Sequence, residues 1–513
     1  KNSFLRANGA NISREITPDV TVVFVFKPHA SQTNMALWGT DNMGWDRFAG
    51  LNVYGNSGVS NGVTGLIDTL TLKNEVFKSY ITTLRSDKNF KSTSHINGWQ
   101  SGEAFTENVG NSSHSFFDIG SIGHDQNVYK GNLDVKEVLV FPKALNNRER
   151  ISLDYYLAKK WGHRLEKVKP LIWPEMVNSL GGEKLSIYGS FAPKDNKVKI
   201  GEKDCEVLSE FGSRIVCRIP ENPDGADKIS LKDIAIIHPV EQDQRLVKGL
   251  AYIGRPGLWF DADDPRSVSP DTLNTSGLIE SWLDKSGEKR NARSINPPKL
   301  KPQEFEGRSV ISLDGTDDYF SLDDVEWQDV LDTDKGESTL FFLGRPTGYG
   351  VSPEHGRGYN ANGILGDKKA WFGLYFDKEG FRTGIDGPTC KHCTTAPRVG
   401  VALNNFYLST LKQQNKETSL QVDGVSSPIG FDKRSIGKLD ARGKTDKLYL
   451  GKGRDSYNHK YKGDIGEVLL YKRNLTDKET SIVQKALKRK WGLSDYPRLS
   501  LVSPNMGAGE GGE

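Results

Sequence analysis

The chain has 513 residues, and its 69 lysines and arginines nearly balance its 66 aspartates and glutamates. This balance argues against a polyanion-binding protein, so we expect no nucleic-acid partner. No run of about 18 apolar residues occurs, so we expect no membrane insertion. The 54 glycines and 22 prolines favour an all-β fold with many turns, and the length suffices for two to four domains. No secretion signal precedes Lys1, as expected of a processed chain or a fragment.

The first predicted element is a buried strand over 19–28, a nearly continuous run of strand-favouring apolar residues. It has a later counterpart in 337–346. Two turns also recur, in which glycine supplies a positive φ. One is His95-Ile-Asn-Gly98, which matches Gln421-Val-Asp-Gly424. The other is Phe117-Asp-Ile-Gly120, which matches Leu448-Tyr-Leu-Gly451.

A strand, a turn and a closing helix follow over 129–162, and the same pattern returns over 461–492. Asn146 with Glu149, and Thr476 with Glu479, are capping boxes that begin the helices. Each helix carries an apolar stripe that predicts a core-facing side, and a glycine after it predicts the end. The stripes are Leu153, Tyr156, Leu157 and Trp161 in the first helix and Val483, Ala486, Leu487 and Trp491 in the second. A repeat of this length predicts two copies of one domain.

Residues 168–253 carry no part of the repeat. The stretches Lys197–Val207 and Ser213–Pro220 resemble the IPT/TIG immunoglobulin-like domain, whose pattern pairs two cysteines across adjacent strands. That resemblance implies a disulfide between Cys205 and Cys217. Such a bond fits an oxidising compartment and thus an extracellular or cell-surface protein.

The second copy carries three further motifs, Leu258–Asp264, Ser281–Gly287 and Ile311–Tyr319. With the closing helix they resemble laminin-G-like (concanavalin A-like) jelly-roll domains of bacterial surface proteins. The resemblance implies two jelly-roll sandwiches, each closed by a C-terminal helix, joined by an immunoglobulin-like β-sandwich. The expected units are 1–167, 168–253, 254–498 and a flexible tail, 499–513.

The first copy is expected to be incomplete. When 2–5 is aligned with 318–321, nothing matches 258–316. A sheet lacking a strand exposes backbone groups and apolar side chains, so something should cover that edge. The edge could be covered by residues upstream of Lys1, by another part of the chain or by a strand from a neighbouring molecule. Donation by a neighbour would give a head-to-tail filament. Within the tail, only Pro497–Ser503 is a credible donor strand.

Cys390 and Cys393 form a Cys-x-x-Cys pair in a turn-rich segment. The pair could be a small disulfide loop, a redox motif or half of a zinc site, and we favour the disulfide because no second suitable pair exists.

Acidic residues gather in predicted turns, where oxygen-rich loops can hold calcium. The candidates are Asp261, Asp263, Asp264, Asp314 and Asp317. They lack the paired-carboxylate strand signature of glycoside hydrolases, and no metalloprotease, nucleophile-elbow or phosphate-loop motif occurs. We expect no enzymatic activity and no required cofactor.

Aromatic residues in or beside loops can stack on sugars, and Trp45, Trp99, Trp371 and Tyr375 are the candidates here. The jelly-roll resemblance implies adhesion or glycan recognition. The expected function is therefore a non-catalytic extracellular structural or adhesive surface protein, a subunit of a filament or other assembly, with copies of itself or other surface proteins as partners. The alternative is a glycan-binding lectin, and a glycoside hydrolase is less favoured.

Overall fold

The computed structural model describes residues 4–10, 12, 17–29, 35–40, 48–51, 59–61, 79–87, 91–105, 116–121, 132–163, 165, 170–189, 191, 194–239, 244–348, 362–367, 372–377, 380–385, 398–414, 417–427, 430–431, 447–453 and 460–493. Most of their regular structure is strand, with two long helices, α1 (Asn147–Lys160) and α3 (Asp477–Trp491). The all-β prediction is thus confirmed. None of the described helices combines the length and apolar character needed to cross a bilayer.

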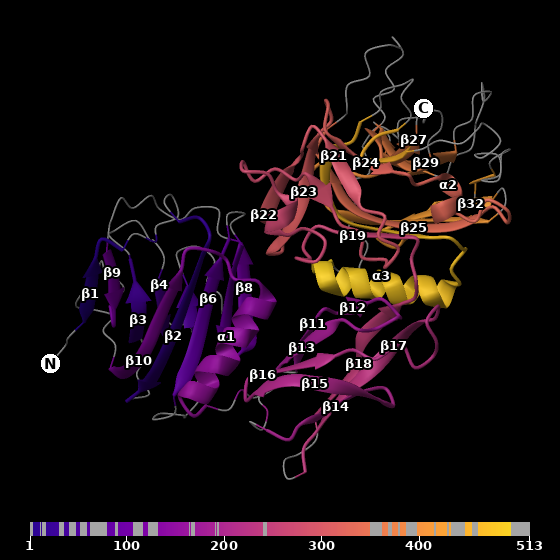
Figure 1. Ribbon diagram of the computed structural model, residues 1–513. Helices are drawn as coiled ribbons and strands as arrows, with labels where there is room; N and C mark the ends of the chain where they lie inside the picture. The colour runs from indigo at the N-terminus through magenta and orange to yellow at the C-terminus, as the bar shows by residue number, and fades with distance from the viewer. Residues whose placement is uncertain are drawn as a thin grey trace, which may run out of the picture.

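Strand pairing stays within three consecutive stretches of chain, here named the first, middle and second sandwich (Figure 1). The predicted domain limits themselves stay a prediction, although no described strand pair crosses them.

The first sandwich has two five-stranded sheets, with orders β1-β9-β3-β4-β5 and β10-β2-β6-β7-β8. Its strands are β1 (Leu5–Asn8), β2 (Val20–Pro28), β3 (Met35–Gly39), β4 (Phe48–Leu51), β5 (Val59–Asn61), β6 (Tyr80–Ser86), β7 (Lys91–Ile96), β8 (Trp99–Phe105), β9 (Phe116–Ile119) and β10 (Leu133–Phe141).

Strand β2 is the buried strand predicted over 19–28, and it is apolar on both faces for a structural reason. Phe24 and Phe26 belong to the core between the sheets, together with Trp38. Val23 and Val25 belong to a second core, which α1 closes. A strand covered on both faces needs a continuous apolar run rather than an alternating one.

The middle sandwich follows one path of eight strands, β11-β13-β16-β15-β14-β17-β18-β12, around a core rich in isoleucine. Its strands are β11 (Leu171–Trp173), β12 (Met176–Val177), β13 (Lys184–Tyr188), β14 (Lys197–Ile200), β15 (Lys203–Phe211), β16 (Arg214–Arg218), β17 (Ile229–Ile237) and β18 (Gln244–Ile253).

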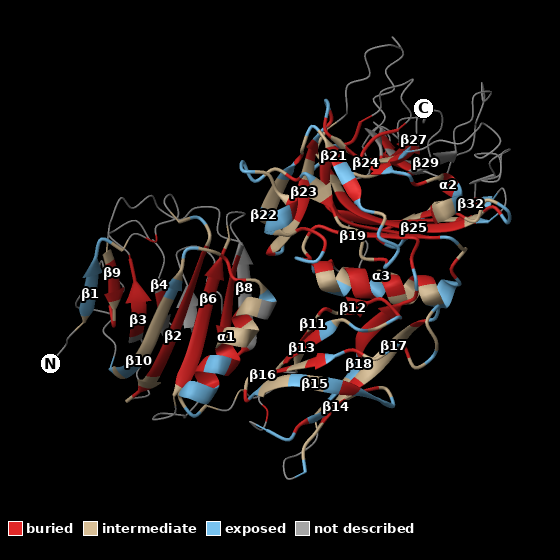
Figure 2. Cartoon of the chain, in the orientation of Figure 1, coloured by how far each residue is buried: buried red, intermediate tan, exposed pale blue. Residues whose placement is uncertain are grey.

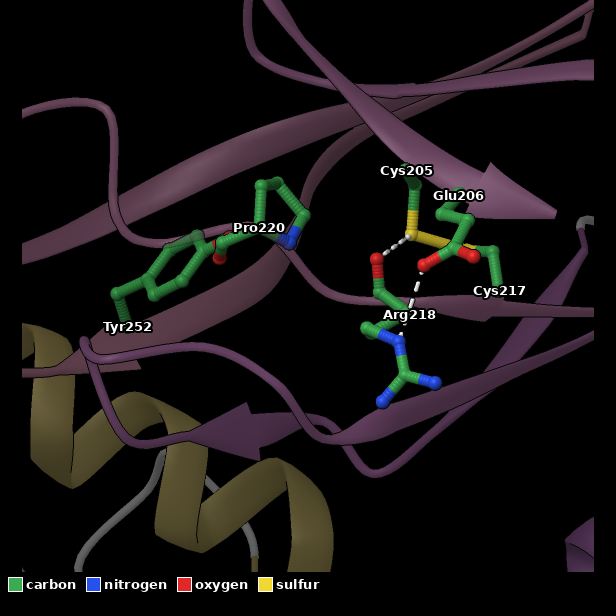
Figure 3. Close-up of a disulfide and its surroundings, with 6 residues drawn as sticks. All are labelled: Cys205, Glu206, Cys217, Arg218, Pro220 and Tyr252. Atoms are coloured by element: carbon green, nitrogen blue, oxygen red, sulfur yellow. Dashed lines mark hydrogen bonds and ion pairs between the residues drawn. A yellow bond between two sulfur atoms is a disulfide. The ribbon is translucent and has the colours of Figure 1, made fainter. Parts of the chain in front are cut away.

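A disulfide joins the paired strands β15 and β16, as expected. Cys205 and Cys217 are bonded, with their Cα atoms 5.6 Å apart (Figure 3). The bond is buried, and it lies beside the ion pair of Arg218 with Glu206. A little further on, the Tyr252 hydroxyl donates to the carbonyl of Pro220 at 2.9 Å.

The second sandwich is the larger copy. Its main sheet runs β22-β23-β36-β25-β31-β32-β33, with β19 also pairing β36 and β34 pairing β32. Two further sheets run β20-β21-β24-β35-β27 and β26-β28-β29-β30.

The strands of the second sandwich are β19 (Leu258–Asp261), β20 (Ser281–Trp282), β21 (Ala292–Ile295), β22 (Lys299–Phe305), β23 (Arg308–Asp314), β24 (Tyr319–Asp323), β25 (Glu337–Pro346), β26 (Asn362–Gly363), β27 (Leu365–Asp367), β28 (Phe372–Asp377), β29 (Gly380–Ile385), β30 (Arg398–Val399), β31 (Tyr407–Gln414), β32 (Glu417–Val422), β33 (Val425–Ser426), β34 (Gly430–Phe431), β35 (Lys447–Leu450) and β36 (Lys462–Tyr471). The short helices η2 (Pro270–Thr272) and α2 (Trp327–Val330) lie in its connections.

The two copies share their register as well as their pattern. Val138 of β10 pairs with Phe24 as Val468 of β36 pairs with Phe342, and both strands bulge just before a glutamate. Both predicted capping boxes are present. The sequence repeat is therefore a repeat of structure, down to single strand pairs.

Helix α3 lies between the second and the middle sandwich (Figure 1). One hydrophobic core combines its residues with Phe341 of β25 and with Met176 and Ile253 of the middle sandwich. All four predicted stripe residues of α3 are buried, which Figure 2 shows as red along the helix.

The stripe predicted for α1 is partly wrong. Leu157 is fully buried, but Tyr156 is 54% exposed and its neighbour Tyr155 is buried instead. The position equivalent to Tyr156 in α3 is Ala486, which belongs to the core shared with the middle sandwich. The Tyr156 ring of α1 instead remains about half exposed in the described structure, because its position is not part of a core shared with the middle sandwich.

We predict that Cys205→Ala/Cys217→Ala lowers the free energy of unfolding. The bond spans a sequence separation of 12 residues, and a cross-link over so short a loop contributes about 3 kcal/mol. Urea unfolding followed by circular dichroism measures the loss. Non-reducing peptide mapping of the native chain should recover the linked peptides, and two free thiols would contradict the assignment.

Candidate functional site

A buried polar site surrounds Glu467 on β36. Its carboxylate accepts hydrogen bonds from Trp259 Nε1 at 2.8 Å, Trp491 Nε1 at 2.6 Å and Lys490 Nζ at 2.7 Å. Glu467 and both indoles are fully buried. A buried charge is stable only with such partners, so this residue fixes β19 and the end of α3 onto β36.

The network continues through opposite charges. Asp261 accepts from Lys285 at 2.8 Å and from Lys490 at 2.5 Å, and Lys285 also pairs with Asp264 at 2.6 Å. Burial alone would raise the pKa of Asp261, but Lys285 and Lys490 outweigh it and hold that pKa below its ordinary value. We name Glu467, Trp259, Trp491, Lys490, Asp261 and Lys285 the Glu467 cluster.

These contacts bear on the predicted calcium ligands. Asp261 and Asp264 face lysines, and Asp263 pairs with Arg308 at 2.8 Å. Among the described residues, no group of three or more histidine, cysteine, aspartate or glutamate side chains is arranged to hold a metal. The calcium site stays a prediction.

The remaining two calcium candidates lie in one turn. Asp314 Oδ1 accepts from the backbone nitrogens of Thr316 at 2.6 Å and Asp317 at 3.3 Å. Burial, together with the neighbouring Asp314, raises the pKa of Asp318 to about 7. In this turn the Asp314 side chain holds the backbone.

Polar contacts join the second sandwich to the middle one. Arg489 Nε pairs with Glu175 at 2.5 Å, Tyr471 donates to the carbonyl of Ile253 at 2.9 Å, and Arg266 pairs with Glu183. Together with the shared core around α3, they join the two sandwiches through buried and charged contacts at several points.

A cleft of about 330 Å³ opens where the three sandwiches meet. It is lined by Asn146 at the start of α1, by Trp173 of the middle sandwich and by Glu306, Arg308 and Arg489 of the second. Its volume is at the lower end of ligand pockets. However, Arg308 and Arg489 are already paired with Asp263 and Glu175.

The first sandwich repeats half of the Glu467 cluster. Glu137 accepts from Trp161 Nε1 at 2.7 Å and from Lys160 Nζ at 2.9 Å, as Glu467 does from Trp491 and Lys490. Here the site is open, because the Lys160 side chain is 42% exposed and that of Glu137 19%. We name Glu137, Lys160 and Trp161 the Glu137 cluster.

The exposure of the Glu137 cluster follows from how β10 is paired, which differs from the pairing of β36. In the second sandwich, β36 pairs with β25 on one edge and with β19 and β23 on the other. Its equivalent β10 pairs with β2, and no described strand pairs with its outer edge, which we name the open edge. Val135 and Val140 on β10 are each 40% exposed, whereas β36 is buried almost throughout.

The opposite sheet of the first sandwich ends in the same way. Strand β1 pairs only with β9 among the described strands, whereas its equivalent β24 pairs with both β35 and β21. All four residues of β1 are exposed. Among the described strands, both sheets of the first sandwich therefore end at strands whose equivalents have a further partner in the second sandwich. That the first copy is incomplete stays a prediction.

A second polar group is buried beneath α1. Arg150 Nη1 pairs with Asp154 at 2.6 Å, and Thr83 donates to Asp154 at 3.2 Å. Burial, with the charges of Arg150 and Arg85, lowers the pKa of His95 to about 2, and burial raises that of Asp154 to about 6. The second sandwich has uncharged Gln421 and Gln484 at the positions of His95 and Asp154.

The predicted sugar-binding and Cys-x-x-Cys residues are not brought together in the described structure. Trp45, Trp371, Cys390 and Cys393 lie outside the described residues. Trp99 begins β8 and Tyr375 lies in β28, but their side chains are also outside the description. These assignments stay predictions.

Sequence reasoning treated Trp161 and Trp491 as core residues and missed the glutamates they bind. One signal could have found them: the Glu, Lys and Trp residues are identical in both copies, each pair 330 positions apart. A charged residue repeated within an apolar strand indicates a bound partner.

No model of a protein family matches the chain, and no curated protein does either. Among solved structures, domain 4 of the extracellular arabinanase AbnA from Geobacillus stearothermophilus, in complex with arabinotriose, is 11% identical. The match covers 45% of this chain and 98% of that one, with a TM-score of 0.33.

Two other matches concern sialidases. The Ruminococcus gnavus IT-sialidase CBM40 bound to α2,3-sialyllactose is 18% identical, covering 29% of this chain and 81% of that one, with a TM-score of 0.23. Trypanosoma rangeli sialidase is 12% identical, covering 88% of this chain and 62% of that one, with a TM-score of 0.31. TM-scores this low do not establish a shared fold, so we use only the contacts described above.

The two glutamates allow a matched comparison. We predict that Glu467→Ala destabilises the protein by about 3–5 kcal/mol, because it leaves two buried indole N–H groups without an acceptor and removes one of the two carboxylate partners of Lys490. Glu137→Ala should cost about 1 kcal/mol, because its partners can bind water. Urea unfolding of both variants measures the difference, and equal losses would contradict the importance assigned to burial.

We predict that His95→Gln makes the protein less sensitive to acid. A histidine whose folded pKa is lowered contributes stability that is fully present above its unfolded pKa of about 6.5 and is lost as pH falls. Between pH 6.5 and pH 5 the wild type should lose about 2 kcal/mol more unfolding free energy than the variant. Urea unfolding at both pH values measures this loss of unfolding free energy. His29→Gln is the control. Parallel pH profiles for His95→Gln and the wild type would refute the prediction.

Proposed function

We propose that this chain is a non-catalytic, extracellular structural or adhesive surface protein that binds other proteins. The observation that carries the proposal is the open edge of the first sandwich, along which β10 has exposed valines and pairs with no described strand, whereas the equivalent strand of the second copy is covered. Exposed edges of this kind are sites of strand addition by other chains.

Other features of the described chain favour a structural role over a catalytic one. Asp261, Asp263, Asp264 and Glu467 of the second sandwich each pair with a lysine or an arginine, an arrangement typical of structural ion pairs rather than of a catalytic acid and base. The buried contacts between the middle and second sandwiches suit a rigid stalk. The Cys205–Cys217 disulfide suits an oxidising compartment outside the cytoplasm.

Glycan binding is the second candidate, and the cleft between the sandwiches favours it. Its volume of about 330 Å³ suits a small ligand, and Trp173 with nearby charged side chains offers both stacking and hydrogen bonding. Adhesion through glycans would use this cleft instead of the open edge.

Immunogold electron microscopy of native cells with antibodies to the chain tests the proposal. We expect label on the outer surface, and label confined to the cytoplasm would overturn it. A glycan array with the purified chain separates the candidates: no sugar binding is expected. Binding to defined sugars that is lost in Trp173→Ala would favour the lectin.

A further inference from the structure

We infer that the open edge of β10 is a docking site for an extended partner segment with the pattern apolar–Trp–apolar–Asp, bound as an antiparallel strand. The inference deepens the proposed function, on which it rests in treating the chain as a protein-binding protein. The second sandwich supplies the template, because there β19 occupies the equivalent edge with Leu258-Trp259-Phe260-Asp261.

The register of that template assigns each partner position. In the second sandwich Asp261 lies opposite Glu467, Trp259 opposite Leu469 and Leu258 opposite Leu470. Transferred to β10, the partner's aspartate lies opposite Glu137, its tryptophan opposite Leu139 and its first apolar residue opposite Val140. Val140 is 40% exposed and Leu470 is fully buried, so a bound strand would cover the apolar surface that is now open.

The indole is specified by a missing hydrogen bond. Glu467 accepts from two indoles, those of Trp259 and Trp491, and from Lys490. Glu137 accepts from Trp161 and Lys160, and no residue in the described part of the first sandwich takes the place of Trp259. A partner tryptophan in that register brings an indole N–H donor to the Glu137 carboxylate and shields that carboxylate from water.

The aspartate is specified by charge. Two lysines flank Glu137: Lys160, which binds it, and Lys136, whose ammonium lies 5.4 Å from the Trp161 ring centre. In the second sandwich, Lys490 is shared between Glu467 and Asp261. Lys136 and the Glu137 cluster together therefore carry one cation more than the Glu137 carboxylate neutralises, and a partner aspartate would take the place beside Lys160 that Asp261 holds beside Lys490.

The test uses the full chain and a fluorescein-labelled peptide with the sequence of residues 255–264. We expect saturable binding by fluorescence anisotropy, weakened about tenfold by Glu137→Gln. The same peptide carrying Trp259→Phe and Asp261→Asn should also bind about tenfold more weakly. Glu206→Gln, which changes an exposed glutamate on the middle sandwich, is the matched control and should bind like the wild type.

Hydrogen exchange locates the peptide. Binding should slow amide exchange over 133–141 and leave the covered strand 462–471 unchanged. The inference is overturned if no saturable binding occurs, if Glu137→Gln binds like the wild type, or if 133–141 gains no protection. A peptide of residues 494–503 that binds more tightly would overturn it in favour of the chain's own tail from a second copy. Failure of the peptide to bind would not change where immunogold labelling places the chain, so this inference and the proposed function can fail separately.

Discussion

The second sandwich depends on one buried carboxylate. Glu467 sits on β36, the strand that pairs with β25, β23 and β19, and its two oxygens receive donors from the first strand of the sandwich and the last turn of its helix. Residues more than 200 positions apart are thus fixed at one point. Because Glu467 and both indoles are buried, each of these hydrogen bonds is stronger than it would be in water.

The first sandwich shows the same chemistry without its enclosure. Glu137 has the same helix partners at nearly the same distances, yet its neighbours reach solvent because nothing equivalent to β19 or β23 covers β10 among the described strands. Identical residues therefore play different parts. In one copy they belong to a closed core, and in the other they form a surface with a defined geometry beside a further lysine, Lys136.

Local patterns in the sequence predicted much of this structure. The apolar run of β2, the capping boxes at Asn146 and Thr476, and the disulfide needed only neighbouring residues or a known motif. The exposure of Tyr156 could not be predicted, because it depends on which layers cover α1. The acidic residues near 261 indicate calcium ligands in the sequence alone, because their cations, Lys285 and Lys490, come from distant positions. The repeated glutamate was visible in the sequence, but its importance depends on burial, which only the fold reveals.

Helix α3 belongs to two sandwiches at once. Its apolar residues share one core with β25 on one side and with β12 and β18 on the other. If the middle sandwich were to unfold, that core would be exposed to water, and loss of the helix would in turn open the second sandwich. The two are therefore coupled as one cooperative unit, through which a pulling force would be transmitted without an intervening hinge. Among the described residues helix α1 shares no such core, because its apolar residues pack against Val23 and Val25 within the first sandwich.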